Sequence, residues 1–157
     1  MMWRSHIAVG VSAWAVFASL ARAPIEPIGL ALAGVGSLLP DLDHPKSWVG
    51  RRLPFISYPL AAIVGHRGVT HSLIVVVVGL ALLLDGKAGW LSAPLIVGYL
   101  SHLAGDYLPP AGVPLLWPSR RIFTAVLFET GSIVEYFVVA GIVIAAIGVT
   151  RAVHWVL

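Results

Sequence analysis

The sequence predicts an all-α integral membrane protein, a helical bundle of about five spans that forms a single domain over residues 1–157. Of these residues 59% are apolar and only 11% are charged, and the mean hydropathy is +0.93. Soluble domains average about 45–50% apolar and about 25% charged residues, and disordered chains need low hydrophobicity, so both classes are excluded. The net charge of +3 favours an anionic membrane surface or a phosphate-bearing ligand. Nucleic acid is not expected as a partner, because the basic residues are scattered among apolar runs.

Five apolar stretches alternate with more polar segments along the chain. They cover residues 7–21, 27–40, 69–84, 90–108 and 132–150. Several are shorter than the roughly 20 residues that a spanning helix needs, so they reach that length only if polar residues at their ends join the helix. The first stretch resembles a signal peptide with a cleavage site at residues 21–23. Pro24 is unfavourable directly after a cut, so we expect this stretch to be retained.

The connector between the second and third stretches predicts both a special element and an orientation. Its middle, residues 53–64, is short and interrupted by Pro59, which favours an interfacial or re-entrant segment. With five spans, the N-terminus, this connector and the 109–131 loop share one face of the membrane. That face carries most of the basic residues, namely Arg4, Lys46, Arg51, Arg52, Arg67, Arg120 and Arg121. The positive-inside rule therefore predicts that it is cytoplasmic.

The rare ionisable residues gather at the stretch ends that share this face. They are His6, Asp41, Asp43, His44, His66, His71, His102, Asp106 and Glu135. A charged side chain within a spanning helix costs a few kcal/mol unless it is paired, solvated or bound to a ligand. His102 and Asp106 are four residues apart, which places both on one face of a helix. Such a gathering indicates a shared polar site.

Imidazoles and carboxylates together predict a divalent metal site. The chain has no cysteine, so thiolate nucleophiles and cysteine-type zinc sites are excluded. Zn²⁺ is the expected ion, with Mn or Fe as alternatives. The number of carboxylates favours two or more ions. The candidate ligands are His6, Asp41, His44, His66, His71, His102 and Asp106, with Thr70, Ser72 and Ser101 as candidate outer partners.

Each motif taken alone also has a structural interpretation. The His102–Asp106 pair could simply fix helix packing through a buried hydrogen bond. Asp43 could cap the segment that follows it. The segment around His66 could bind lipid headgroups. It is the gathering of all these residues at one face that favours a metal site.

Four segments resemble the YdjM-like family of bacterial inner-membrane proteins, which are regarded as metal-dependent hydrolases. These segments are residues 38–47, 65–72, 98–102 and 110–118, and the likeness extends over about residues 6–137. The family is considered a distant relative of zinc phospholipase C and of zinc-dependent single-strand nucleases. By motif, the resemblance implies zinc ligands at His6, Asp41, His66 or His71, His102, Asp106 and Glu135. Residues 107–153 contain no histidine, whereas those relatives carry further ligands after the His-x-x-x-Asp motif.

We therefore expect a hydrolase of the bacterial inner membrane that cleaves a phosphate ester of a lipid or amphiphile with a metal-activated water at the cytoplasmic face. Asp43 or Glu135 is the candidate general base. The basic side chains expected to neutralise the phosphoryl oxygens are Arg67, Lys46, Arg120 and Arg121. The bilayer is a partner, and the glycine-rich stretches would permit a homo-oligomer. Two alternatives stay open: a divalent-metal or proton-coupled carrier, and a metal-stabilised protein without catalytic activity.

Overall fold

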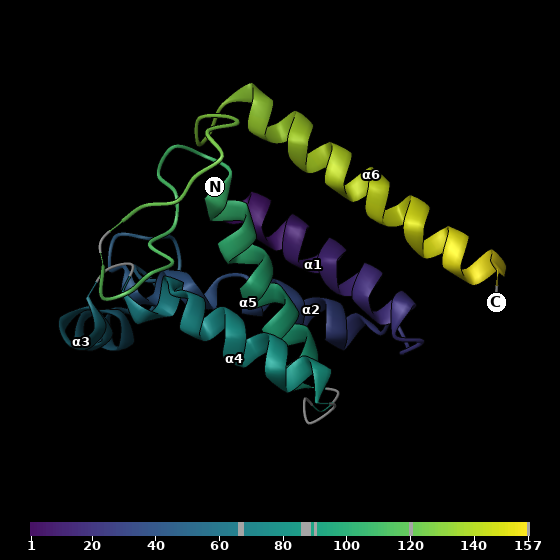
Figure 1. The fold of residues 1–157 in the computed structure, drawn as a ribbon, viewed down its shortest axis with the longest axis horizontal. Coiled ribbons are helices and arrows are strands. Elements are labelled where there is room, and N and C mark those ends of the chain that lie inside the picture. The colour runs from purple at the N-terminus through teal and green to yellow at the C-terminus, as the bar shows by residue number, and fades with distance from the viewer. Residues whose placement is uncertain (66–67, 86–88, 90, 120, 157) are drawn as a thin grey trace.

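The protein folds into helices connected by a short turn at one end and by long segments at the other (Figure 1). The computed structural model describes residues 1–157 except 66–67, 86–88, 90, 120 and 157. The side chains of residues 64, 154 and 156 are also not described. The helices are α1 (Trp3–Leu20), α2 (Pro27–Gly36), η1 (Leu39–Asp43), α3 (Pro54–Val64), η2 (Val69–His71), α4 (Leu73–Leu84), α5 (Ser92–Tyr107) and α6 (Ile133–Val156). In the described part of the chain the only extended pairing is an isolated bridge between Val113 and Phe123. The all-α class is therefore confirmed.

Two of the predicted stretches are divided between an α-helix and a 3-10 helix. The second stretch was expected to continue to Pro40, but α2 ends at Gly36 and the 3-10 helix η1 follows. Pro40 lacks an N–H and its ring crowds the preceding turn, which explains the change of helix type. The third stretch was expected to begin at Val69, but Val69–His71 forms η2 and α4 begins only at Leu73. In both places the irregular turn carries candidate ligands.

The connector forms a helix of its own, α3, which packs against η1. Its Ser57 is fully buried, whereas Phe55, Tyr58 and Ile63 are exposed, the last at 83%. An exposed apolar face on a short helix is typical of a segment that lies in a membrane interface. The helix thus fits the interfacial alternative predicted for this connector.

Only α6, among the described helices, is long and apolar enough to cross a membrane, over Ile133–Val153. The apolar helices α3 and α4 are shorter than a spanning helix requires. Helix α6 lies along α1 and leaves most of its surface exposed (Figure 1). One spanning helix is therefore evident, and the arrangement of about five spans stays a prediction.

Small residues bring α1, α2 and α5 into close contact at the centre of the molecule. Each of these helices packs against the other two. A Cβ atom at Gly98 of α5 would collide with the Ala33 carbonyl of α2 and lie 2.9 Å from the Ser37 nitrogen. At Gly36 of α2 it would collide with the Leu95 backbone of α5. The absence of side chains at these points lets the two backbones touch, which holds the end of α2 against α5.

Replacing Gly98 with alanine should destabilise the protein by about 2 kcal/mol, because the colliding atoms belong to the backbone and cannot move aside cheaply. The free energy of unfolding in a mild detergent measures this effect. Gly141→Ala in α6 is the matched control, since nothing lies within 4 Å of the position its Cβ would take. The control should be neutral or stabilising by up to about 1 kcal/mol. Equal stability of the two variants would contradict the packing described here.

Candidate metal centre

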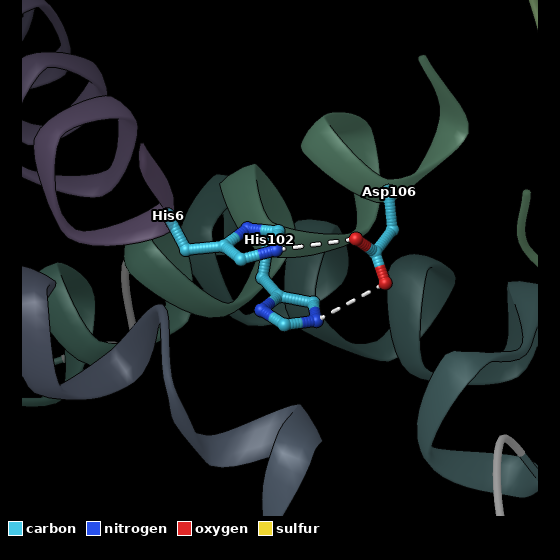
Figure 2. Close-up of side chains that lie close together, drawn as sticks. All are labelled: His6, His102 and Asp106. Carbon is cyan, nitrogen blue, oxygen red and sulfur yellow. Dashed lines mark ion pairs between the residues drawn. The ribbon is translucent and has the colours of Figure 1, made fainter. Parts of the chain in front are cut away.

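The first group of candidate ligands joins α1 to α5. Figure 2 shows the rings of His6 from α1 and His102 from α5 beside the carboxylate of Asp106. The His6 Nε2 atom lies 3.1 Å from Asp106 Oδ1, and the His102 Nε2 atom lies 3.6 Å from Asp106 Oδ2. All three side chains are almost completely buried. One potential ligand atom from each lies within 4.8 Å of the others, a spacing that suits a shared metal ion.

The two imidazoles of this group are stacked. Their ring centroids are 3.8 Å apart and their planes differ by 16°. Gly105 makes room for this arrangement, because a Cβ atom there would lie 3.3 Å from two atoms of the His6 ring. Helix α5 therefore supplies His102 and Asp106 on one face and leaves a gap beside them for the ring from α1.

A second group is formed by Asp41 of η1, His71 of η2 and His102. The Asp41 Oδ1 atom lies 3.9 Å from His102 Nε2, and the His71 ring meets the His102 ring edge-on with centroids 5.6 Å apart. His102 belongs to both groups, so the five residues make one assembly. We call His6, Asp41, His71, His102 and Asp106 the His/Asp cluster.

The protonation of His102 follows from its contact with α2. Its Nδ1 atom lies 2.7 Å from the carbonyl oxygen of Ser37. A carbonyl can only accept a hydrogen bond, so in the neutral ring Nδ1 carries the proton and Nε2 keeps its lone pair. Nε2 is the atom that faces Asp41 and Asp106. This is the arrangement in which a histidine binds a metal, with its other nitrogen held by a backbone carbonyl.

Asp43 lies beside the cluster, next to His71. The carboxylate is fully buried and accepts a hydrogen bond from Thr70 Oγ1. Because the Thr70 hydroxyl hydrogen points to Asp43, its oxygen can accept a hydrogen bond from His71 Nδ1, which is 3.1 Å away. The His71 Nε2 lone pair is then available. Tyr99 of α5 donates to the Thr70 carbonyl at 2.7 Å and ties this turn to the helix that carries His102.

Several buried nitrogen atoms of the cluster have no hydrogen-bond partner among the residues that the structure describes. They are His6 Nδ1, His71 Nε2 and His102 Nε2. Buried polar atoms are almost always satisfied, so unpaired imidazole nitrogens in such a position need another partner. A divalent ion would provide it for the His71 and His102 nitrogens. The Asp106 carboxylate also contacts the Met1 amino group at 2.7 Å, so a positive group from the beginning of the chain lies beside it.

The other predicted site residues lie elsewhere or are not described. Glu135 is buried and accepts hydrogen bonds from the backbone nitrogens of Met2 (2.9 Å) and Gly131 (2.7 Å), so it links the beginnings of α1 and α6. His44 is half-buried and belongs to neither group, while Lys46 and Arg121 are exposed. Ser72 and Ser101 bond to backbone carbonyls within their own turns. His66, Arg67 and Arg120 lie outside the described residues.

The sequence pattern missed two partners of the cluster. One is the Ser37 carbonyl, a backbone group for which no residue type gives a signal. The other is Tyr99, which lies three residues before His102 and so near the same helix face. That spacing was the only available clue to its role.

Comparison with known proteins places the whole chain in one family. The family model described as YdjM inner membrane protein matches residues 1–157. The chain is 47% identical over 109 residues to "Inner membrane protein YdjM" of Escherichia coli (strain K12), and equally to that of Shigella flexneri. Those matches cover 64% of this chain, which spans only 56% of the length of these relatives.

A third relative matches over nearly its full length. "Uncharacterized protein YvsG" of Bacillus subtilis (strain 168) is 32% identical over 151 residues, which is 93% of this chain and 92% of the relative. No solved structure matches. The resemblance in the four sequence segments is thus confirmed, and the chain belongs to the YdjM inner membrane protein family.

Proposed function

We propose that this protein is a metal-dependent hydrolase of the inner membrane that cleaves a phosphate ester of a lipid or other amphiphile at the cytoplasmic face. The observation that supports this proposal is the buried His/Asp cluster, in which two groups of potential ligands share His102. Four of its five ionisable side chains are buried and Asp41 is half-buried, and burying such groups in so apolar a chain is costly unless they bind a ligand. Family membership supports the membrane location.

The donor set suits two ions of a borderline metal. Imidazole and carboxylate ligands favour zinc, with manganese or iron as the nearest alternatives. His6, His102 and Asp106 would hold one ion, and Asp41, His71 and His102 would hold the other or lie beside it. Such ions, when bound, lower the pKa of water and neutralise phosphoryl oxygens.

Asp43 is the best-placed general base among the described residues. It is buried, lies 3.7 Å from His71 Nδ1 and is oriented by Thr70. A carboxylate in this position can accept a proton from water beside the ligands. Glu135 has a different role in this proposal, because its two oxygens bond to backbone N–H groups. It would position His6 by fixing the beginning of α1.

An apolar groove supports an amphiphilic substrate. It has a volume of about 690 Å³ and lies between α1, α4, α5 and α6, with Val9, Leu100, Ala104 and Ile142 among its lining residues. Ala104 lies between His102 and Asp106 in the sequence of α5 but faces another side of the helix, so the groove passes the level of the cluster on the opposite side of α5. A lipid tail could lie against this groove while its phosphate approaches the cluster. Lys46 and Arg121, both exposed, and the undescribed Arg67 and Arg120 are the proposed phosphate partners.

Removing His102 should abolish metal binding. We expect His102→Ala to lower zinc affinity at least about 100-fold, because loss of even an outer partner of a ligand costs roughly 10–100-fold. Metal content of the purified protein, measured by mass spectrometry, tests this. His6→Ala should remove one ion and leave the other. His154→Ala, in the last turns of α6, is the control and should leave the metal content unchanged.

Removing Asp43 should impair hydrolysis more than metal binding. Asp43→Asn should lower phosphate release from a lipid panel about 10²–10⁴-fold, the usual contribution of a general base. Glu129→Gln, at an exposed loop acid, should leave the rate unchanged. Metal binding by the unchanged protein without hydrolysis across the panel would instead favour a carrier or a metal-stabilised protein.

The proposed orientation can be tested with single cysteines, because the chain has none. Arg51 and Arg22 are both exposed and lie at opposite ends of the helices that carry the cluster. In intact cells a membrane-impermeant thiol reagent should label Arg22→Cys, whereas Arg51→Cys should react only after the membrane is opened. The reverse pattern would place the cluster on the outer side.

A further inference from the structure

Two tryptophans and two arginines form a stacked arrangement at the beginning of α1. The rings of Trp3 and Trp48 are stacked with centroids 4.2 Å apart and planes 19° apart. The Arg52 guanidinium lies 3.7 Å from the centroid of the Trp48 ring, and the Arg4 guanidinium lies 5.2 Å from that of Trp3. We call these four residues the Trp–Arg stack. None of them belongs to the cluster or has a role in the hydrolysis proposed above.

The guanidinium groups of the Trp–Arg stack have N–H donors that can bind an anion. Arg52 Nη1 donates to the Trp48 carbonyl at 3.0 Å, which fixes the side chain against the ring. A guanidinium that lies on an aromatic face keeps its remaining N–H groups pointing outward in its own plane. Arg4 and Arg52 are both exposed, and neither makes an ion pair with any acid in the described part of the chain. Their positive charge is therefore available to an external partner.

The position of the stack connects it to the end of the molecule that carries the cluster. Trp3 precedes His6 by about one turn of α1, and Trp48 follows Asp43 by five residues. Lys46 and Arg51 nearby are also exposed. Helix α3 begins two residues after Arg52, and its exposed apolar side chains start at Phe55. Tryptophan, arginine and exposed apolar side chains occur together where a protein meets lipid headgroups.

We propose that the Trp–Arg stack binds the phosphate of an anionic phospholipid headgroup and does so without the metal. The proposal rests on the membrane-interface position assumed in the proposed function, but not on hydrolysis. Arginine pairs with phosphate through two parallel N–H bonds, and the cytoplasmic leaflet presents anionic lipid phosphates in quantity. The half-buried tryptophan rings would rest at headgroup depth and keep both arginines facing that layer.

Short-chain phosphatidylglycerol tests this proposal with the full-length protein in a non-ionic detergent. Arg4→Lys/Arg52→Lys keeps the charge but removes the flat, forked donor groups, and both side chains are exposed, so the variant should fold. We expect its affinity for dihexanoyl phosphatidylglycerol, measured by calorimetry, to fall about tenfold, the equivalent of one charge-assisted hydrogen bond. The matched control Arg22→Lys/Arg151→Lys changes two exposed arginines at the other end and should bind normally.

Each comparison has an outcome that would overturn the proposal. Unchanged binding by the Arg4→Lys/Arg52→Lys protein would mean that net charge alone attracts the lipid. Equal affinity for phosphatidylcholine of the same chain length would rule out selection for anionic headgroups. Equal affinity for inorganic phosphate would identify a free phosphate site instead of a lipid site.

The His102→Ala protein separates this proposal from the proposed function. It should bind phosphatidylglycerol as the unchanged protein does, because the stack contains no metal ligand. Loss of lipid binding in that variant would show that the stack does not act independently, which contradicts the proposal. Conversely, the lysine substitutions could leave lipid affinity unchanged while the protein still binds metal and hydrolyses its substrate. That result would overturn the proposed lipid site and leave the hydrolase proposal intact.

Discussion

The hydrogen bond between His102 and the Ser37 carbonyl is the contact on which the centre of this protein depends. It selects the tautomer of the histidine that belongs to both groups of potential ligands. The carbonyl can reach the ring only because α2 and α5 touch at their backbones, where Gly36 and Gly98 leave no side chain between them. The packing of α2 against α5 and the orientation of His102 therefore depend on each other, since moving these helices apart would break the hydrogen bond that orients the ring.

The cluster gathers buried ionisable side chains within an otherwise apolar chain. Only 11% of the residues are charged, yet the protein buries several carboxylates and imidazoles close together. Each buried carboxylate and imidazole must be satisfied by its neighbours, as Thr70 and Tyr99 do for the turn around Asp43 and His71. Among the described residues some imidazole nitrogens have no hydrogen-bond partner, and these are the atoms to which the proposed ions would bind.

Sequence reasoning could predict the helices and the gathering of ligands, but not the contacts that orient them. Apolar runs located the principal helices, and the i, i+4 spacing placed His102 and Asp106 on one face. Alternating chain direction predicted that the distant residues His6, Asp41 and His71 would meet there. The hydrogen bond that Glu135 accepts from the Met2 nitrogen, and the stacking of Trp3 on Trp48, depend on registers between distant segments that no local pattern encodes. The number of spans is likewise not fixed by helix length, because only α6 is long enough on its own.

The two proposed sites lie at the same end of the molecule but use different chemistry. The His/Asp cluster uses histidine, and the Trp–Arg stack uses arginine. A histidine binds a cation through the lone pair of its neutral ring, and the three imidazoles of the cluster are buried. Guanidinium groups stay charged at any physiological pH, and the two arginines of the Trp–Arg stack are exposed. An anionic lipid phosphate would meet the exposed arginines first, and the buried ligands would be reached only by a group that leaves water behind. The stack would therefore select its lipid by charge, and the cluster would independently select its substrate by desolvation.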